Sequence, residues 1–473
     1  MSPGVKRQCA AMPDNRCIGN FAEWKILRCT DMTPSPPYDS VAHQPASRAY
    51  AWSVFAILFL LMVVDYVDRQ VVVSMFPHLK AAWALSDGQL GGLVSVVSIT
   101  VALGTVPLSL LADRWSRVKS IFVMALVWST ATLACAYAEN YTQLMGARSF
   151  VGLGEAAYGA AGAALLASLF PVRMRSTILG AFLAAALVGS VLGVVLGGVI
   201  AQRWGWQAGF GAVAIPGLLL AFVFLFVVRD YKTVALPSSP SMQGDRTGKM
   251  SVRAVAAALL KPRTALITCL GAGLQLVMVS TTYAWLSSFF NRYYNLAPDQ
   301  AGLKTGLVVL LSGVGAVVWS VVADRLSARF PRARLYVPAA AGLMTAALMI
   351  PAFGLSSPGP LQFGLILAGA TLMTATIGPA AAVVVDVVHP SVRATAASVL
   401  ALTQNLFGLA AGPLLAGALS DVYGLPFAMS VVPLFCVLAA AMFVVAARTY
   451  EADLKLAGSI EPATNDKLEP QAA

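Results

Sequence analysis

The amino-acid sequence predicts an all-α membrane protein with twelve transmembrane helices in two six-helix pseudo-repeat bundles. Three observations support this fold class. The chain has 473 residues, of which 58% are hydrophobic and only 11% charged, whereas soluble proteins keep about 25% of their residues charged. Apolar runs of about 20 residues, each long enough to cross a bilayer, recur along the chain. Motifs of the first half also return in the second half at a nearly constant offset.

The apolar runs form two groups of six, and the segments around these groups are polar. The predicted spans lie near 50–72, 89–112, 118–138, 142–170, 176–201, 208–228, 264–290, 302–324, 335–354, 361–388, 394–419 and 426–447. We therefore expect an N-terminal cytoplasmic tail at 1–48, a six-helix bundle at 49–228, a cytoplasmic linker at 229–263, a second bundle at 264–448 and a C-terminal tail at 449–473.

The positions of Lys and Arg indicate the orientation of the chain in the membrane. With both termini inside, the cytoplasmic connections contain seventeen of these residues and the outer connections four. Because Lys and Arg favour cytoplasmic loops, we expect a multi-pass protein of the cell inner (plasma) membrane with both termini cytoplasmic. The chain has a net charge of +11, but its Lys and Arg residues form no basic patch interleaved with aromatic residues. We therefore expect no nucleic acid partner.

The polar segments are expected to carry little structure. Residues 250–260 predict a short helix on the membrane surface, and residues 18–27 predict a weaker one. Residues 449–473 lack apolar periodicity, which favours disorder. Met32 is an alternative start, in which case residues 1–31 would not belong to the native protein.

Two sets of motifs reveal the internal repeat. The segment Ser109–Ser116, which contains Ala-Asp-Arg, matches Ser320–Ser327 at an offset of 211 residues. Three glycines of the fifth span then match three of the eleventh span at an offset of 219 residues: Gly189, Gly193 and Gly198 match Gly408, Gly412 and Gly417. We interpret the glycine rows as close-packing surfaces between helices. Two matching bundles around a central site are typical of carriers that work by alternating access.

Two short stretches hold nearly all the charge inside the apolar spans. Arg148 and Glu155 are seven residues apart and so share one helix face. In the first span, Asp65 lies three and four residues before Asp68 and Arg69, again on one face. Charges at membrane depth must face protein or a water-filled cavity, so we expect the two stretches to face each other.

Three family motifs lie in the first half of the chain. The loop motif G-x-L-A-D-R-x-G-R-x-K corresponds to Ser109–Lys119, with serine in place of both glycines. The motif R-x-x-x-G-x-G is complete at Arg148–Gly154, whereas the antiporter motif G-x-x-x-G-P of the fifth span has Val194 instead of proline. The chain thus resembles the major facilitator superfamily from about 48 to 447. This resemblance implies a monomer in which Asp113 and Arg114 form a gating latch.

Within that superfamily, the pattern R-x-x-x-G-x-G-E-A-x-Y from Arg148 to Tyr158, with Asp68-Arg69, resembles the Spinster-like group. That group is associated with lysophospholipids and sphingosine phosphate, so the resemblance implies an amphiphilic anionic or zwitterionic substrate. The pattern Y-x-D-R at Tyr66–Arg69 also resembles the organic-anion symporters, which implies hexuronate-like or aromatic acids as an alternative. Those proteins usually have proline where this chain has Ala157. A multidrug-type efflux carrier is a further alternative.

The buried carboxyl groups are candidates for proton coupling. Desolvation inside a bundle disfavours the charged form of Glu155, whereas Arg148 nearby favours it, so a substrate anion that engages Arg148 would let Glu155 take up a proton. Alternatively, Arg148 and Glu155 form a permanent structural pair. Asp68 is either a second proton site or the partner of Arg69, and Asp65 is expected to orient Arg69 as its salt-bridge partner.

Arg69 and Arg148 are candidate ligands for an anionic head group, because guanidinium groups offer forked donors suited to phosphate or carboxylate. Leu367 and Thr374 occupy the positions that correspond to Arg148 and Glu155 in the second half, which therefore offers no buried charge. This asymmetry favours an amphiphile whose tail lies on that half. Polar residues that are candidates to line the same cavity are Tyr158, Gln275, Tyr283, Thr374, Gln404 and Asn405.

Other classes of function find little support. The sequence contains no Gly-x-x-x-x-Gly-Lys-Ser/Thr loop for ATP, and its three histidines are dispersed. No nucleophile–base pair or metal-ligand spacing is visible, so we expect no enzyme, no catalytic residues, no metal and no cofactor. The expected partners are the small-molecule substrate, protons and membrane lipid. A transporter-shaped sensor without flux remains an alternative.

Overall fold

The computed structural model describes residues 47–229, 262–388 and 393–458, and these residues are almost entirely helical. Twelve of its helical segments are long and apolar enough to cross a membrane, as predicted. The elements are α1 (Arg48–Ser74), α2 (Phe76–Trp83), α3 (Asp87–Arg114), α4 (Arg117–Ala136), α5 (Tyr141–Glu155), α6 (Tyr158–Leu169), α7 (Val172–Trp204), α8 (Trp206–Val227), α10 (Arg263–Tyr293), α11 (Pro298–Ser327), α12 (Ala333–Gly354), α13 (Pro360–Met373), α14 (Ile377–Asp386), α15 (Arg393–Thr403), the π-helical segment η3 (Gln404–Ala410), α16 (Ala411–Tyr423), α17 (Leu425–Val431) and α18 (Leu434–Gly458).

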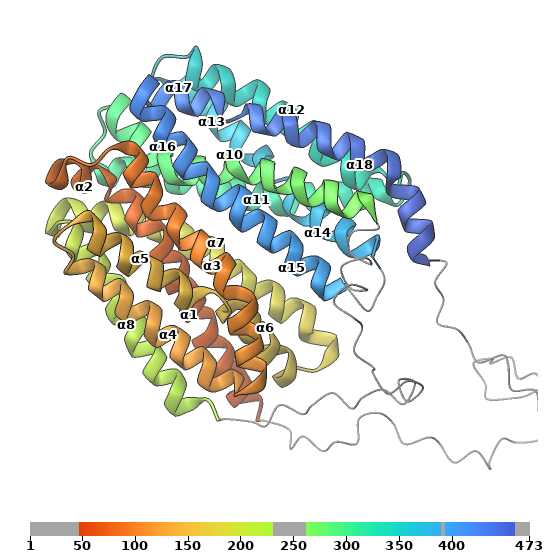
Figure 1. Cartoon of the computed structure of the whole chain (residues 1–473), viewed down its shortest axis with the longest axis horizontal. Helices are drawn as coiled ribbons and strands as arrows, with labels where there is room; N and C mark the ends of the chain where they lie inside the picture. Colours follow the sequence, from red (N-terminus) through yellow and green to blue (C-terminus); the bar gives the residue numbers. More distant parts are fainter. Residues whose placement is uncertain (1–46, 230–261, 389–392, 459–473) are drawn as a thin grey trace, which may run out of the picture. The chain divides into compact units, whose positions relative to one another are not determined.

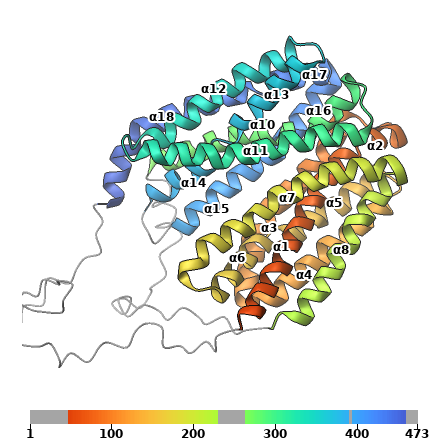
Figure 2. The same ribbon diagram turned by 180° about the vertical axis from the view of Figure 1, so that it is seen from behind.

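The two halves of the chain form two helical bundles. Helices α1 to α8 lie together, and helices α10 to α18 lie together beside them (Figures 1 and 2). Helix α8 ends and α10 begins at the same end of the molecule, which we call the linker end; the opposite end, where α3 begins at Asp87, is called the Asp87 end. The all-α fold of twelve spans in two six-helix pseudo-repeats is therefore confirmed.

The fourth and tenth spans are each broken near the middle. Helix α5 ends at Glu155 and α6 begins at Tyr158, while α13 ends at Met373 and α14 begins at Ile377. The two breaks correspond at the same offset of 219 residues as the glycine rows. In the first break, the hydroxyl group of Thr105 donates a hydrogen bond of 3.0 Å to the carbonyl oxygen of Ala156. A freed backbone group is thereby satisfied inside the bundle, where water is scarce.

The glycine rows pack helices closely, as predicted. A side chain added at Gly193 of α7 would meet the carbonyl oxygen of Val67 in α1 at 2.7 Å. A side chain added at the equivalent Gly412 in α16 would lie as close to the carbonyl oxygen of Val277 in α10, also at 2.7 Å. Gly189 and Gly197 extend the first contact one turn in each direction. Each row therefore fixes the first helix of its half against the fifth span.

The structure differs from the prediction at the C-terminal end of the last span. Helix α18 continues to Gly458, although residues from 449 onward were expected to be disordered. Two polar contacts explain the extension. The carboxylate of Asp453 accepts a 2.9 Å hydrogen bond from the backbone N–H of Thr264, at the start of α10, and Glu451 lies 2.8 Å from the guanidinium group of Arg332. The expected surface helices at 18–27 and 250–260 lie outside the described residues.

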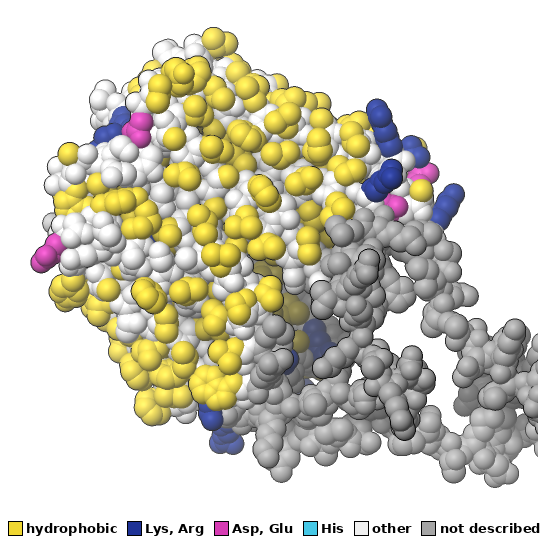
Figure 3. Space-filling model, viewed as in Figure 1, with side chains coloured by type: hydrophobic (Ala, Val, Ile, Leu, Met, Phe, Trp, Pro, Cys, Tyr) yellow, Lys and Arg dark blue, Asp and Glu magenta, His cyan; other side chains and the backbone are white. Residues whose placement is uncertain are grey.

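The outer surface of the bundles is apolar. Hydrophobic side chains cover the visible face, and the charged side chains in this view gather toward the ends of the helices (Figure 3). Large side chains such as Leu103, Phe226 and Val317 are more than 60% exposed, which would be unfavourable in water. This surface suits the hydrocarbon core of a bilayer and leaves the bundle interior as the place for charged groups.

Candidate functional site

Five charged residues meet in the interior of the first bundle: Asp65, Asp68 and Arg69 of α1, and Arg148 and Glu155 of α5. The sequence predicted that these stretches would face each other, and they do. Asp65, Asp68, Arg148 and Glu155 are buried, with exposed fractions of 4% or less. Arg69 remains partly exposed, with 19% of its side chain accessible. We call these five residues the charge cluster.

Of the three pairings proposed from the sequence, Asp65 with Arg69 is present, whereas Arg148 does not pair with Glu155 and Asp68 does not pair with Arg69. Arg69 contacts Glu155 at 2.8 Å, whereas Arg148 contacts the carboxylate of Asp68 at 3.3 Å. Each arginine therefore pairs with a carboxylate of the other helix, and Arg148 and Glu155 are not each other's partners. Asp65 lies 3.6 Å from Arg69, which agrees with its expected orienting role.

The charge cluster contains one more acid than base. Three carboxyl groups and two guanidinium groups give a net charge of −1 when all are ionised (−3 + 2 = −1). An uncompensated charge is strongly unfavourable in a buried site, so the cluster is neutral when it holds one proton. Asp65 and Glu155, which both lie beside the guanidinium group of Arg69, are the candidates to hold that proton.

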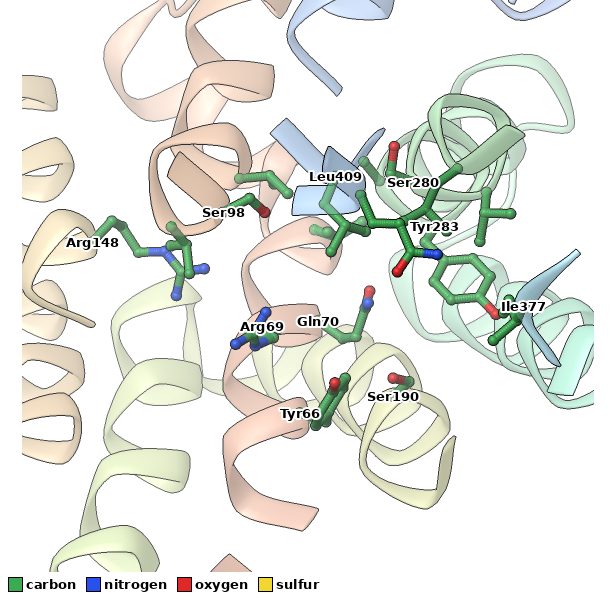
Figure 4. Close-up of a pocket in the computed structure, with 17 residues that line it drawn as sticks. Tyr66, Arg69, Gln70, Ser98, Arg148, Ser190, Ser280, Tyr283, Ile377 and Leu409 are labelled. Carbon is green, nitrogen blue, oxygen red and sulfur yellow. The ribbon is translucent and has the colours of Figure 1, made fainter. Parts of the chain in front are cut away.

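Beside the charge cluster lies a cavity of about 310 Å³ between the two bundles. Arg69 and Arg148 stand on one side of it, and Ser280, Tyr283, Leu409 and Ile377 stand on the other (Figure 4). The residues of the second half that line the cavity are all uncharged: Leu276, Val279, Ser280, Tyr283, Ala284, Ile377, Gln404 and Leu409. The predicted asymmetry between a charged and an uncharged wall is therefore present in the folded protein.

Arg69 connects the cavity to the buried acids. Its side chain lines the cavity and contacts Glu155, while Glu155 and Asp65 are not among the cavity residues. The ring of Tyr66 lies under the guanidinium group, 5.3 Å from its carbon, and helps to fix its position. An anion in the cavity would therefore meet Arg69 first and act on Glu155 through it.

Two residues expected to contact substrate lie away from the cavity. Tyr158 is fully buried; its hydroxyl group donates a 2.7 Å hydrogen bond to the carbonyl oxygen of Leu58, and its ring packs against Trp128. Thr374 sits at the second helix break and donates a 2.6 Å hydrogen bond to the carbonyl oxygen of Ser312. Both satisfy their polar groups inside one bundle, and neither lines the cavity in this conformation.

The remaining polar candidates divide into two groups. Tyr283 and Gln404 line the cavity, whereas the amides of Gln275 and Asn405 donate to backbone carbonyl groups of Met373 and Ala401.

The predicted gating residues Asp113 and Arg114 end α3, but their side chains lie outside the part of the chain that the structure describes.

Several residues of the cavity wall were not predicted from the sequence. Tyr66, Gln70 and Val73 line it together with Arg69, and their spacing of three and four residues places them on one face of α1. This periodicity around Arg69 was a usable signal. Ser98 and Ser190, by contrast, have no such signal, because small polar residues occur throughout the spans.

Known proteins are similar to this chain over most of its length. The chain is 27% identical over 375 residues to an MFS-type efflux pump of Mycolicibacterium smegmatis, covering 78% of this chain and 85% of the relative. It is 25% identical over 382 residues to protein spinster of Drosophila melanogaster (78% and 62% covered), and 24% identical over 375 residues to a probable L-galactonate transporter of Escherichia coli (73% and 82% covered).

A solved structure shares the fold. The crystal structure of a bacterial homolog of the human lysosomal transporter Spinster, in an inward-facing and unoccupied conformation, matches with a TM-score of 0.78 and 21% identity. The match covers 86% of this chain and 99% of that structure. The resemblance to the Spinster-like group that the motifs indicated is thus present in both sequence and fold. Residues 58–409 match the model of the Major Facilitator Superfamily, and the chain belongs to this family of membrane transporters.

Proposed function

We propose that this chain is a proton-linked secondary transporter that moves an amphiphilic anionic or zwitterionic solute, such as a lysophospholipid or a sphingoid phosphate, by alternating access. The observation that carries the proposal is the one-sided cavity. Two guanidinium groups stand on one wall, and the facing wall is uncharged. A head group with a phosphate would bind the arginines, while an apolar tail would lie against the second bundle.

The charge cluster supports proton linkage. When an anionic head group binds Arg69, it competes with Glu155 for the same guanidinium group. Glu155 then loses its neutralising partner in a buried site, and taking up a proton removes the resulting charge. Asp68 keeps Arg148 in place. Substrate and proton thus occupy the site together in this scheme.

We further propose that the linker end faces the cytoplasm of a cell inner membrane, with both termini on that side. The excess of Lys and Arg among connections predicted to lie at this end supports the orientation. Ion pairs and hydrogen bonds join the two halves at the Asp87 end. The described conformation would then be closed toward the outside. Binding that favours one state over the other would shift the balance between them.

A symporter of small organic anions is the second candidate. The cavity volume of about 310 Å³ is at the lower end for ligand pockets, and Ser280, Tyr283 and Gln404 offer hydrogen-bonding groups opposite the arginines. A compact sugar acid could use both walls. The similarity to a probable L-galactonate transporter and to a hexuronate transporter of Bacillus subtilis supports this alternative.

Transport by purified protein in proteoliposomes tests these proposals. A fluorescent lysophospholipid and a labelled hexuronate are offered in parallel, with and without an imposed pH gradient. Protein-dependent, gradient-driven movement of the lipid supports the amphiphile proposal, and movement of the hexuronate alone supports the organic-anion alternative. If either solute moves at the same rate with and without the pH gradient, proton linkage is contradicted. Protein that moves neither solute in sealed vesicles contradicts both substrate assignments.

A further inference from the structure

Several polar side chains line the cavity without a hydrogen-bond partner in the part of the chain that the structure describes. Four come from the first bundle and one from the second: Tyr66, Gln70, Ser98, Ser190 and Gln404. The carboxamide oxygen of Gln70 is buried and accepts no hydrogen bond, and Ser98 and Ser190 are only 6% and 5% exposed. These five residues, which we call the polar set, can form hydrogen bonds only with what fills the cavity.

Other hydroxyl groups in the same helices are bonded to the protein itself. Thr100 and Thr105 of α3 donate to carbonyl oxygens one turn earlier, at 2.9 and 2.6 Å, as hydroxyl groups in helices commonly do. Ser98 of the same helix donates to no carbonyl group among the described residues. On the facing wall, Ser280 donates a 2.9 Å hydrogen bond to the carbonyl oxygen of Gly408. The polar set is therefore distinct from the hydroxyl groups that serve only the packing of helices.

Close packing holds two members of the polar set in place beside Arg69. Tyr66, Arg69 and Gln70 share one face of α1 and line the cavity together (Figure 4). A Cβ atom added at Gly189 of α7 would lie 2.7 Å from the Cβ atom of Tyr66, and one added at Gly193 would lie 2.8 Å from that of Gln70. Because α7 lies so close, these side chains stay directed at the cavity. An anion bound to Arg69 would have the amide of Gln70 beside it.

The cavity offers no negative charge to a cationic part of a head group. Among the described residues no carboxylate lines it, and the ring of Tyr66 already lies against the guanidinium group of Arg69, at 5.3 Å. A choline group would therefore meet no counter-ion, and its methyl groups cannot hydrogen bond. A substrate that displaces water from polar groups must replace the hydrogen bonds of that water, since buried donors and acceptors without partners weaken binding. A choline head group would leave the polar set unsatisfied.

We propose that the polar set recognises hydroxyl groups, and that the substrate carries hydroxyl groups next to its anion. Arg69 and Arg148 hold the anion, while hydroxyl groups, which both donate and accept, complete the bonds of the amides and hydroxyls of the polar set. The proposal rests on the proposed transport function and narrows its substrate class. A lysophospholipid with a glycerol head group fits, and one with a choline head group does not. A hexuronate offers the same chemistry, a carboxylate flanked by hydroxyl groups, so the test must separate these two sources.

Equilibrium binding to purified protein in phosphatidylcholine nanodiscs tests this recognition. Two radiolabelled lysolipids share one acyl chain and one negative charge: lysophosphatidylglycerol has hydroxyl groups on its head group, and lysophosphatidylethanol has none. Glucuronate and hexanoate form the same comparison for a small acid. Gln70→Leu and Ser190→Ala each remove one member of the polar set with little change in size. Gln202→Leu, at an exposed position of α7 outside the cavity, is the matched control. Binding to empty nanodiscs is subtracted.

We expect the parent protein to bind lysophosphatidylglycerol at least about tenfold more tightly than lysophosphatidylethanol, because each hydrogen bond contributes a factor of about two to ten. In folded Gln70→Leu or Ser190→Ala, this preference should fall by about two- to tenfold while the affinity for lysophosphatidylethanol is kept. Gln202→Leu should retain the preference of the parent. Equal affinities within both pairs of probes, or an unchanged preference in both folded variants of the polar set, would overturn the proposal.

The small acids and a flux measurement separate the remaining outcomes. A preference for glucuronate over hexanoate, without one between the lysolipids, supports hydroxyl recognition and assigns the substrate to the sugar acids. A hydroxyl preference in binding without any flux in proteoliposomes leaves the polar set standing and contradicts the transport function instead. Flux of both lysolipids with equal affinity supports the transport function and contradicts hydroxyl recognition. Protein that binds none of the four probes contradicts the proposal.

Discussion

At the scale of single residues, the decisive feature is the exchange of partners between α1 and α5. Arg148 neutralises Asp68 and is 1% exposed, whereas Arg69 is partly exposed and holds Glu155. The two arginines therefore differ in their surroundings. Arg148 lines one edge of the cavity while paired with Asp68, whereas Arg69 reaches both the cavity and Glu155.

Glu155→Gln tests the coupling role of this carboxyl group. The substitution preserves the size of the side chain but cannot release or take up a proton. We expect accumulation driven by a pH gradient to fall by roughly an order of magnitude, within the range of typical coupling free energies, while exchange without a gradient persists. The measurement is solute uptake into proteoliposomes. Glu139→Gln, at an exposed position between α4 and α5, is the control, and an unchanged pH response of Glu155→Gln would contradict the coupling role.

The structural role of Arg148 predicts a different outcome. Arg148→Gln leaves Asp68 charged and buried, and we expect a loss of about 3–5 kcal/mol in the free energy of unfolding. The double variant Arg148→Gln/Asp68→Asn removes both charges and should recover most of that stability. Denaturant unfolding in detergent micelles measures both effects. If the second substitution restores nothing, the pair is not what makes Arg148 necessary for folding.

At the scale of helices, glycine faces determine where the charge cluster sits. The row of Gly189, Gly193 and Gly197 lets α7 approach the backbone of α1 at Val63, Val67 and Val71. Val67 immediately precedes Asp68 and Arg69, so this contact sets the depth and rotation of both charged side chains. The break after Glu155 has a related effect, because it ends α5 at the residue that faces Arg69.

Gly193→Ala should therefore disturb the protein more than a glycine substitution elsewhere in the same helix. Its new methyl group would lie 2.7 Å from a carbonyl oxygen of α1, and we expect destabilisation of about 1–3 kcal/mol. Gly180→Ala is the matched control, since no atom lies within 4 Å of its added Cβ and alanine favours the helix by up to about 1 kcal/mol. The stabilities of the two variants are compared by thermal unfolding. Equal stability would show that α7 can move away from α1 without loss.

At the scale of the whole molecule, charge is confined to two places. The lipid-facing sides of the spans are apolar, the helix ends carry most charged groups, and one isolated cluster lies inside the first bundle (Figure 3). This arrangement is stable only if the bundles cross a bilayer. It also leaves the second bundle with an uncharged wall at the cavity, so the two halves have unequal roles despite their common fold.

The orientation of the molecule can be checked with two cysteine substitutions in a cysteine-free background. Glu139 lies exposed between α4 and α5 at the Asp87 end, and Phe330 is 67% exposed between α11 and α12 at the linker end. We expect an impermeant thiol reagent to label Glu139→Cys in intact cells, and to label Phe330→Cys only after the membrane is permeabilised. The reverse pattern would place the linker end outside.

The sequence by itself determined the class of protein, the twelve spans, the internal repeat and the membership of the charge cluster. Composition and span length decide the first two, because a bilayer accepts only long apolar helices. The repeat follows from matching motifs such as Gly189 and Gly408. The cluster follows from the scarcity of charge at membrane depth, which leaves Asp65, Asp68, Arg69, Arg148 and Glu155 no other partners.

Only the tertiary structure decided which of these residues touch. Helical periodicity relates residues of one helix, such as Arg148 and Glu155, but it gives neither the rotation nor the height of one helix against another. Those depend on close packing, here of glycines, between helices far apart in the chain. For this reason, three features appear only once the bundles are assembled. The ion pairs join Arg69 to Glu155 and Arg148 to Asp68. Tyr158 and Thr374 bond inside one bundle and do not line the cavity, and Asp87 contacts Arg292 and Asp421.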